Sequence, residues 1–419
     1  MFLHRRRLLA TAGAATLLSA ARLRRAKAQA PNGPIKIPVV MALSGPLALV
    51  GEQVRLGTDI TAEMINKSGG ILGRPLELVY RDDKGLPADS IAVVRELTST
   101  GSNLLIAGLT SVVTNPILPV LAETKAVAVL LAAQGLPVTH ELYTRYMFRC
   151  SDDEYQRARG HAKLASERTP DARKWGAIFT DAQTYRDIYA NFQKFATDYY
   201  TAIGGAAPTF ADPIQVKFGT TDFRTQLAQL SSLDIDALLT IVVGADSVTC
   251  WQQARAFGIA SKFKIVLDQS IDLAAAKTLQ SNLPPNMWTI TPWYSENYPN
   301  NTISRTMAAE YVARTKNPIP SGYLGYGHLC VMAVAEGIRG AHGATDSESF
   351  ISATEGLKFL SAKGDVWFRR EDHQLIQDTN YINIVPLDKD PGYRIVHGLS
   401  LPGAELVEPP TPGVKFVRT

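Results

Sequence analysis

Short apolar runs alternate with helix-like segments along most of this chain, and this alternation restricts the fold more than any other feature. In the first 150 residues the apolar runs are residues 35–43, 76–80, 104–107 and 126–131, and the helix-like segments are residues 51–66, 90–98 and 115–125. A strand that is apolar along its whole length needs cover on both faces, and intervening helices supply that cover. The pattern therefore predicts an α/β fold with a parallel, doubly wound sheet.

The same alternation begins again near residue 175 and predicts a second α/β unit. Its expected strands are residues 175–180, 214–218, 237–243 and 264–267, and its expected helices are residues 184–202, 222–233 and 247–258. Further helices are expected at residues 303–315, 323–341 and 347–357, and short strands at residues 365–368 and 381–386. The 419 residues suit two lobes of roughly 150–200 residues each. No low-complexity linker separates the units, so we expect lobes joined by several crossing segments.

The first 30 residues have the pattern of a signal peptide. Arginines at positions 5–7 precede an uncharged apolar stretch at residues 8–21, and residues 26–28 and 28–30 are both small-x-small cleavage options. The apolar stretch is shorter than the roughly 18 residues that a membrane span needs. The arginines followed by two leucines resemble a twin-arginine export signal, and a general secretory signal is the alternative. We expect an exported, periplasmic protein without a lipid anchor.

The charge of the chain beyond this leader argues against a nucleic-acid partner. Of the 43 Lys and Arg residues, seven lie in the first 30 positions, which contain no acidic residue. The remaining chain therefore has 36 basic and 39 acidic residues. A nucleic-acid-binding domain would instead present a basic stripe.

Signatures of catalysis, cofactor binding and metal binding are absent from the sequence. It contains no G-x-S-x-G, H-E-x-x-H, Walker A or G-x-G-x-x-G motif. The three cysteines are Cys150, Cys250 and Cys330. Their wide spacing fits neither a metal cluster nor a disulfide framework, and at most one pair can bridge. His161, His328 and His373 are isolated, so we expect surface or hydrogen-bonded helix positions rather than ligands. No enzyme activity, cofactor or metal is expected.

Ligands of open parallel sheets bind beyond the carboxyl ends of the strands. The loops at those ends are residues 44–51, 108–115, 131–137, 181–185, 244–246 and 268–270. We therefore expect any ligand to contact side chains or backbone groups from these loops.

Several of these segments, in their order and spacing, resemble the Leu/Ile/Val-binding protein family, the type I periplasmic binding proteins of ABC importers. The segments are SGPLALVG at 44–51, NKSGGILGRP at 66–75, YRDD at 80–83, CSDD at 150–153, ARAFG at 254–258 and FRREDHQ at 368–374. The resemblance implies two lobes joined by three crossing segments around a cleft that closes on a small molecule. It also implies membrane permease subunits as partners, and we expect a monomer.

The resemblance also implies the boundaries of the lobes. The first lobe would comprise residues 35–149 and 293–365, and the second would comprise residues 150–292 and 366–405. Residues 406–419 would form a C-terminal tail.

Four ligand contacts of the first lobe follow from the resemblance. Ser111 occupies the position of a serine that holds the ligand carboxylate, and a hydroxyl at a helix start suits an anion. Capping of the helix is the alternative role for this residue. Ala132 and Gln134 match a backbone-plus-hydroxyl pair, although Gln134 stands where a threonine-like residue is usual. Val50 would line the side-chain pocket.

Of three contacts that the resemblance implies in the second lobe, two depart from the family pattern. Tyr185 matches a ligand-contacting tyrosine, whereas Gly244 occupies an aromatic position and Gln269 the position of the acid that binds the ligand ammonium. If the alignment with the family is shifted by one residue, Asp268 instead of Gln269 occupies the position of this acid. A neutral Gln269 would lose a charged hydrogen bond of roughly 1.5–3 kcal/mol. This departure favours a carboxylate or amide that lacks the ammonium group.

Two aromatic residues, Trp293 and Tyr294, lie near the expected crossing between the lobes. They could line a pocket for an aromatic ligand, or they could pack the hinge, because large aromatic side chains dominate protein cores. Taken together, the sequence predicts a solute-binding component of an ABC importer for an amino acid or a related carboxylate or amide. A ligand sensor on the same fold and an exported hydrolase are the alternatives.

Overall fold

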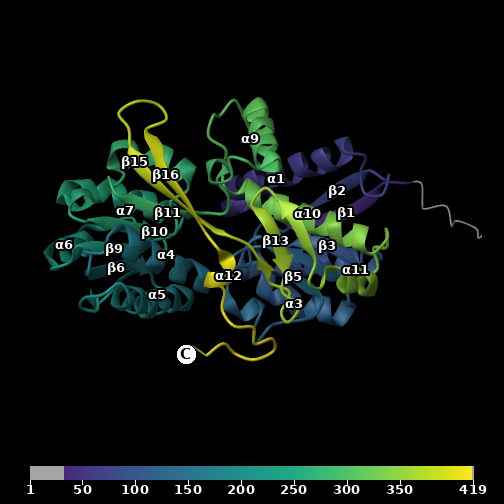
Figure 1. Ribbon diagram of the computed structural model, residues 1–419, viewed down its shortest axis with the longest axis horizontal. Helices are drawn as coiled ribbons and strands as arrows, with labels where there is room; N and C mark the ends of the chain where they lie inside the picture. Colours follow the sequence, from purple (N-terminus) through teal and green to yellow (C-terminus); the bar gives the residue numbers. More distant parts are fainter. Residues whose placement is uncertain (1–32, 418–419) are drawn as a thin grey trace, which may run out of the picture.

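The computed structural model describes residues 33–417 and divides them into two lobes (Figure 1). The first lobe contains a five-stranded parallel sheet of order β2-β1-β3-β4-β5. Its strands are β1 (Ile35–Met41), β2 (Leu76–Asp82), β3 (Leu104–Ala107), β4 (Val127–Leu130) and β5 (Met147–Arg149), and its helices are α1 (Ala48–Lys67), α2 (Pro87–Ser99) and α3 (Ser111–Thr124). The expected parallel, doubly wound sheet is confirmed.

The second lobe contains an eight-stranded sheet of order β16-β15-β11-β10-β9-β6-β7, with β8 paired to β6. Its strands are β6 (Lys174–Thr180), β7 (Thr209–Phe210), β8 (Ile214–Val216), β9 (Ala237–Ile241), β10 (Ile265–Asp268), β11 (Met287–Thr291), β15 (Thr379–Pro386) and β16 (Tyr393–Leu401). Its helices are α4 (Glu154–Arg168), α5 (Gln183–Ala202), α6 (Arg224–Ser232), α7 (Ala245–Ala254) and α8 (Leu273–Leu279). The sheet is mixed, because β15 pairs antiparallel with both β11 and β16.

The chain returns to the first lobe after β11. This return contains α9 (Thr302–Thr315), α10 (Leu324–Gly340) and α11 (Ser347–Thr354), followed by a small sheet of β12 (Lys358–Ser361), β13 (Gly364–Phe368) and β14 (Leu375–Ile376). Val366, Phe368 and Leu375 are buried in the first-lobe core. We therefore propose that the third crossing lies after Ile376 rather than at the expected boundary before residue 366.

The C-terminal tail contacts both lobes. After β16, α12 (Gly403–Leu406) lies against α4 of the second lobe, and the tail then continues toward the first lobe (Figure 1). There the Gly413 N–H donates to the His140 carbonyl oxygen at 2.7 Å. The Phe416 ring lies 4.8 Å from the His140 ring and 5.5 Å from the Tyr155 ring of α4. The tail thus forms a fourth connection between the lobes.

Close packing of α1 against α10 depends on two glycines. A Cβ atom on Gly57 would lie 2.2 Å from the Leu324 carbonyl oxygen, and one on Gly327 would lie 2.3 Å from the Val54 carbonyl oxygen. Real Cβ atoms do not approach backbone oxygens so closely, so each helix is held near the backbone of the other. This contact fixes the start of α10, which carries part of the site described below.

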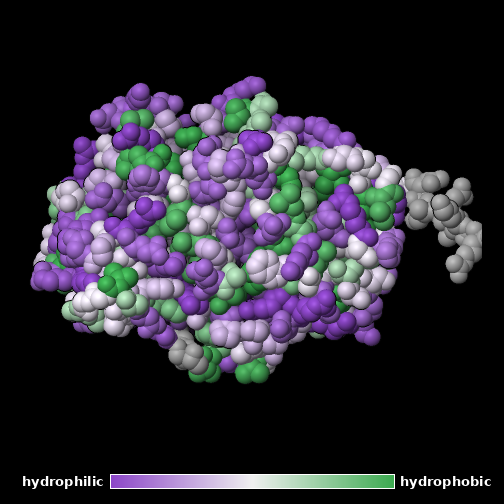
Figure 2. Space-filling model, in the orientation of Figure 1, coloured by the Kyte–Doolittle hydropathy of each residue, from purple (hydrophilic) through white to green (hydrophobic). Residues whose placement is uncertain are grey.

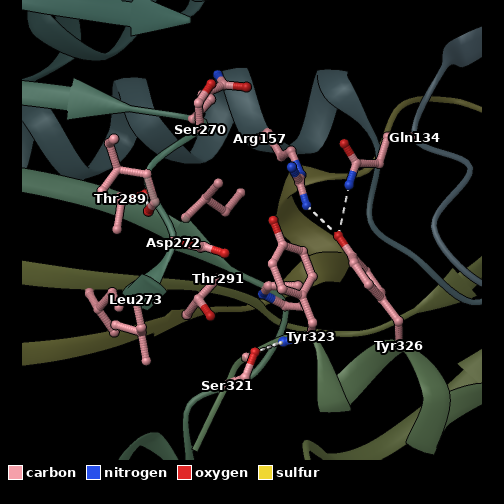
Figure 3. A pocket seen from close by; sticks show the side chains of 16 residues that line it. Gln134, Arg157, Ser270, Asp272, Leu273, Thr289, Thr291, Ser321, Tyr323 and Tyr326 are labelled. Atoms are coloured by element: carbon pink, nitrogen blue, oxygen red, sulfur yellow. Dashed lines mark hydrogen bonds between the residues drawn. The ribbon is translucent and has the colours of Figure 1, made fainter. Parts of the chain in front are cut away.

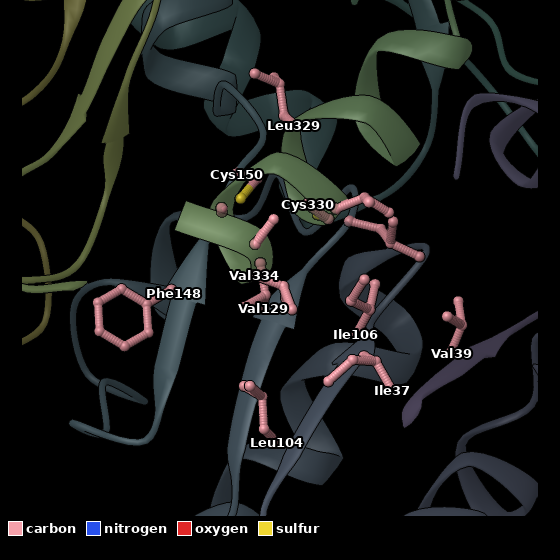
Figure 4. Packing of buried hydrophobic residues seen from close by; sticks show 14 of the residues in the cluster. Ile37, Val39, Leu104, Ile106, Val129, Phe148, Cys150, Leu329, Cys330 and Val334 are labelled. Carbon is pink, nitrogen blue, oxygen red and sulfur yellow. The ribbon is translucent and has the colours of Figure 1, made fainter. Parts of the chain in front are cut away.

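All three cysteines are buried and free. Cys150 and Cys330 belong to the apolar core of the first lobe (Figure 4), whereas Cys250 belongs to the core of the second. The Cys330 thiol donates to the Leu130 carbonyl oxygen at 3.4 Å. The cysteines therefore act as small core residues, as free cysteines commonly do.

The surface of both lobes is mainly polar on the face shown in Figure 2, with apolar residues in small separate groups. This distribution is expected when each lobe buries its own apolar residues, and the structure contains separate apolar clusters for the two lobes. In residues 33–417, no helix is both long enough and apolar enough to cross a membrane.

Candidate ligand-binding site

A cavity of about 150 Å³ lies where the two lobes meet (Figure 3). Gln134, Tyr323 and Tyr326 line it from the first lobe. Residues from the second lobe complete the lining, among them Arg157, Gln269 and Asp272. Polar side chains from different lobes that converge on one cavity are typical of a ligand-binding site.

The Tyr326 hydroxyl accepts hydrogen bonds from residues of both lobes. Gln134 Nε2 donates to it at 2.7 Å, and Arg157 Nη2 donates to it at 2.7 Å (Figure 3). Burial raises the pKa of Tyr326 to about 12, so the phenol stays protonated at neutral pH. Tyr326 lies in the first turn of α10 and Arg157 in the first turn of α4, so two helix starts bring the groups together.

A buried ion pair holds Arg157 in place. Its Nη2 lies 3.0 Å from Asp152 Oδ1, and both side chains are almost inaccessible to solvent. Burial opposes the charge of Arg157, but the nearby Asp152 carboxylate outweighs this effect and raises the pKa of the guanidinium. The Nε atom of Arg157 is buried and has no hydrogen-bond partner among the described residues.

Gln269 lies in the loop after β10 and lines the cavity from the second lobe. Its Nε2 atom is 3.4 Å from Nδ1 of the buried His161. Burial, and then the charge of Arg157, lower the pKa of His161 to about 3, so this ring is neutral at physiological pH. The Gln269 amide thus contributes a polar but uncharged group to the wall, and the neutral His161 ring contacts it from behind the lining.

The carboxylate of Asp268, the alternative to Gln269, forms its hydrogen bonds within the second lobe. Its Oδ1 atom accepts from the N–H groups of Ser270 at 2.7 Å and Ile271 at 2.5 Å, and its Oδ2 atom accepts from Thr240 Oγ1 at 3.0 Å. The side chain is fully buried. Burial raises the pKa of Asp268 to about 6. This carboxylate shapes the loop that carries Gln269 and does not line the cavity.

The acid on the cavity wall is Asp272, which sequence reasoning missed. Asp272 caps α8, and its Oδ1 accepts from the Ala275 N–H at 2.8 Å. Burial raises the pKa of the Asp272 carboxyl. Burial, and then Asp272, raise the pKa of the neighbouring Tyr323. The only feature of the sequence that could have indicated Asp272 is its position two residues after the expected loop 268–270.

Of the seven residues expected to bind a ligand, the structure brings Gln134 and Gln269 to this cavity and places the others outside its lining. Ser111 starts α3, and its Oγ accepts from the Gly135 N–H at 2.8 Å. Ala132 is buried, and its N–H donates to the Gly108 carbonyl oxygen at 3.0 Å. The hydroxyl of Ser111 and the backbone N–H of Ala132 thus already have partners inside the first lobe.

The other three expected residues lie at separate places. Val50 is half-buried in α1 against the first-lobe core, and Tyr185 is half-buried in α5 against the second-lobe core. Gly244 is exposed and precedes α7 with a φ of 65°, a conformation that favours glycine.

Trp293 packs the hinge. It is buried in a cluster with residues of α1, α9 and α10, and its Nε1 donates to Ser304 Oγ at 3.1 Å. Tyr294 is partly buried against the second-lobe core. The packing interpretation therefore describes both residues. In the described part of the chain, no group of three or more His, Cys, Asp or Glu side chains could hold a metal ion.

The fold and the cavity together define the two-lobed architecture of type I periplasmic binding proteins. Residues 34–389 match the family of periplasmic binding proteins. The chain belongs to this family, and the resemblance to Leu/Ile/Val-binding proteins is confirmed.

Known relatives and solved structures agree with this assignment. The Leu/Ile/Val-binding protein BraC3 of Rhizobium johnstonii is 29% identical over 49% of this chain and 53% of its own length. The matches to three such relatives span 53%, 35% and 60% of their lengths. A Brucella ovis leucine-, isoleucine-, valine-, threonine- and alanine-binding protein in its closed conformation superposes with a TM-score of 0.79 at 19% identity, over 92% of this chain and all of the other. A Rhodopseudomonas palustris HaA2 solute-binding protein in complex with p-hydroxybenzoic acid superposes with a TM-score of 0.72 at 20% identity, over 88% and 97% of the two chains.

Proposed function

We propose that this protein is the solute-binding component of an ABC importer of the branched-chain amino acid type. It would capture a small carboxylate, an amide or an amino acid between its lobes. The observation that carries the proposal is the cavity, which Gln134 and Tyr326 line from one lobe and Arg157 and Gln269 from the other. Membership in the periplasmic binding protein family supports the same function.

The proposal includes export to the periplasm as a soluble monomer that delivers its ligand to membrane permease subunits. Support for export comes from the sequence of the first 30 residues, which lie outside the described residues. Their twin-arginine-like pattern favours that route over general secretion.

The groups around the cavity favour a ligand with one acceptor-rich end. Tyr326 and Arg157 offer hydrogen-bond donors, whereas Asp272 offers an acceptor that suits a hydroxyl or ammonium group. The relative from Rhizobium is named for leucine, isoleucine and valine, and the Rhodopseudomonas structure holds p-hydroxybenzoic acid. These ligands all carry a carboxylate, which is the chemical group that we expect here.

Capture would proceed by closure of the lobes. A ligand that contacts both lobes binds the closed form more tightly than the open form, so it shifts the equilibrium toward closure. The crossings after β5, β11 and β14 would supply the hinge, and the closed surface would be presented to the permease.

A thermal-shift screen of residues 31–419 tests the proposal. One set of compounds holds branched-chain and polar amino acids, and the other holds aromatic and short aliphatic carboxylates and amides. A ligand that binds only the folded form adds about 2.7 kcal/mol of stability at a hundredfold excess over its Kd. A raised midpoint with members of either set supports capture of such solutes. Unchanged midpoints in both sets would contradict the proposed ligand class.

Replacing Gln269 by Glu is expected to increase the affinity for amino acids such as leucine. The new carboxylate would face the cavity and could pair with the ligand ammonium, a gain of about 10- to 100-fold for a charged hydrogen bond. Titration calorimetry with leucine measures the change. Gln229→Glu makes the same charge change on an exposed face of α6 and should have no effect. Equal leucine affinity in wild type and Gln269→Glu would contradict the importance of a neutral Gln269.

A further inference from the structure

The hydrogen bonds of Tyr326 leave its own hydroxyl hydrogen available. The phenolic oxygen already accepts from Gln134 Nε2 and from Arg157 Nη2, each at 2.7 Å. These two bonds use its acceptor capacity, while its O–H is still a donor. Among residues 33–417, no acceptor is recorded for this hydrogen, although the side chain is only 3% exposed. A buried donor of this kind requires a partner.

The geometry directs this donor toward the cavity. Gln134 and Arg157 approach the hydroxyl from the loop after β4 and from α4, and Tyr326 itself lines the cavity (Figure 3). Gln134 and Arg157 occupy the two lone pairs of the oxygen. Rotation about the C–O bond can therefore point the hydroxyl hydrogen into the cavity. The positive charge of Arg157 polarises the O–H bond and strengthens it as a donor.

We propose, on the basis of the proposed function, that Tyr326 is a specificity-determining residue. Its hydroxyl would donate a hydrogen bond to a carboxylate or carbonyl oxygen of the ligand. Gln134 and Arg157 are positioning residues that hold the phenol for this contact. The buried Nε of Arg157, which also lacks a partner among the described residues, adds positive potential at the same end of the cavity.

The opposite chemistry of Asp272 gives the ligand an orientation. The Asp272 carboxylate is a hydrogen-bond acceptor, and it lines the same cavity as Tyr323 and Arg157. The ligand's oxygen-rich end would therefore face Tyr326, and any hydroxyl or ammonium group would face Asp272. A ligand that carries only donors, such as a simple amine, would find no acceptor at the Tyr326 end.

The test compares wild type with Tyr326→Phe by titration calorimetry, with leucine, benzoate, 4-hydroxybenzoate and benzamide as probes. The variant keeps the ring and removes only the hydroxyl, so we expect an affinity loss of about 10- to 100-fold for the carboxylate that binds wild type best. The loss should be smaller for benzamide than for benzoate, because a neutral carbonyl forms the weaker bond. This comparison within one variant does not depend on its stability.

Tyr189→Phe is the matched control. Tyr189 is also buried, and its hydroxyl donates to the Ala211 carbonyl oxygen at 3.2 Å, away from the cavity. The control should bind every probe as wild type does. Carboxylate affinity in Tyr326→Phe within about twofold of wild type would overturn the inference and would indicate that the Tyr326 hydroxyl donates to Oε1 of a reversed Gln134 amide instead. Failure of every probe to bind wild type would overturn the proposed function, and the inference with it, before any variant is measured.

Discussion

Replacing Arg149 by Met is expected to lower the free energy of unfolding by about 3–5 kcal/mol, because the change removes a buried cation that pairs with the carboxyl groups of Asp153 and Glu408. Arg149 is the last residue of β5 in the first-lobe sheet and is completely buried. Its Nη2 lies 2.8 Å from Asp153 Oδ2 and 3.5 Å from Glu408 Oε1, and both carboxylates are also inaccessible. Its other nitrogens donate to the Gly135 carbonyl oxygen at 3.0 Å and to the side chain of Gln374.

These contacts join four parts of the chain, so the loss should affect the whole molecule. Denaturant unfolding at neutral pH measures the change in free energy. Adding Glu408→Gln to the Arg149→Met variant should recover part of the loss, because it removes one of the buried acids that Arg149 pairs with. Arg95 pairs with Glu123 on the surface, and Arg95→Met should leave the unfolding midpoint unchanged. A small effect of Arg149→Met would contradict a structural role for the buried cluster.

Acid is expected to destabilise the protein through His328, and this effect should disappear in His328→Gln. The ring is buried, its Nε2 accepts from the Ala362 N–H at 2.9 Å, and its Nδ1 lies 2.9 Å from Thr61 Oγ1. Burial lowers the pKa of His328 to about 3 from the ordinary value of 6.5. Below pH 6.5 the unfolded chain therefore binds a proton that the folded chain does not bind, and stability falls.

The expected loss from His328 is about 1.4 kcal/mol per pH unit below pH 6.5, or about 3 kcal/mol by pH 4. Denaturant unfolding of wild type and His328→Gln between pH 7 and pH 4 measures it as a difference in slope. Other buried groups, such as His161 and Asp268, are common to both proteins and cancel in this difference. His342 is exposed, so His342→Asn should keep the wild-type slope. Parallel pH profiles for wild type and His328→Gln would contradict the buried, neutral ring.

Much of the fold could be predicted from the sequence, because apolar strands between amphipathic helices leave few arrangements. The mixed second sheet was harder to predict from the sequence, since β15 and β16 come after a long first-lobe segment and pair antiparallel. The proposed later position of the third crossing, after Ile376, was hard to anticipate for a similar reason. Residues 365–368 were expected as a short strand, but nothing in their pattern indicates which core Val366 and Phe368 would join.

The candidate site was predicted only in part. Local sequence identified the loops of Gln134 and Gln269, but Arg157 and Tyr326 lie far apart in sequence and on helices that look ordinary in isolation. Their contact depends on how the two lobes sit together, which no local pattern encodes. His161, His328 and His373 are all buried, so of the two expected alternatives the surface position is wrong. His161 in α4 and His328 in α10 occupy hydrogen-bonded helix positions, which was the other alternative. His373 lies outside a helix, and its Nδ1 is 2.9 Å from the Met147 carbonyl oxygen. They are isolated in sequence but not in space.

Small-angle X-ray scattering tests the central claim most directly, with the ligand that raises the unfolding midpoint most in the thermal-shift screen. If the ligand is held between lobes that close around it, saturation should reduce the radius of gyration, and a compound that gives no thermal shift should leave it unchanged. A radius of gyration that stays the same at saturating ligand would contradict capture by lobe closure.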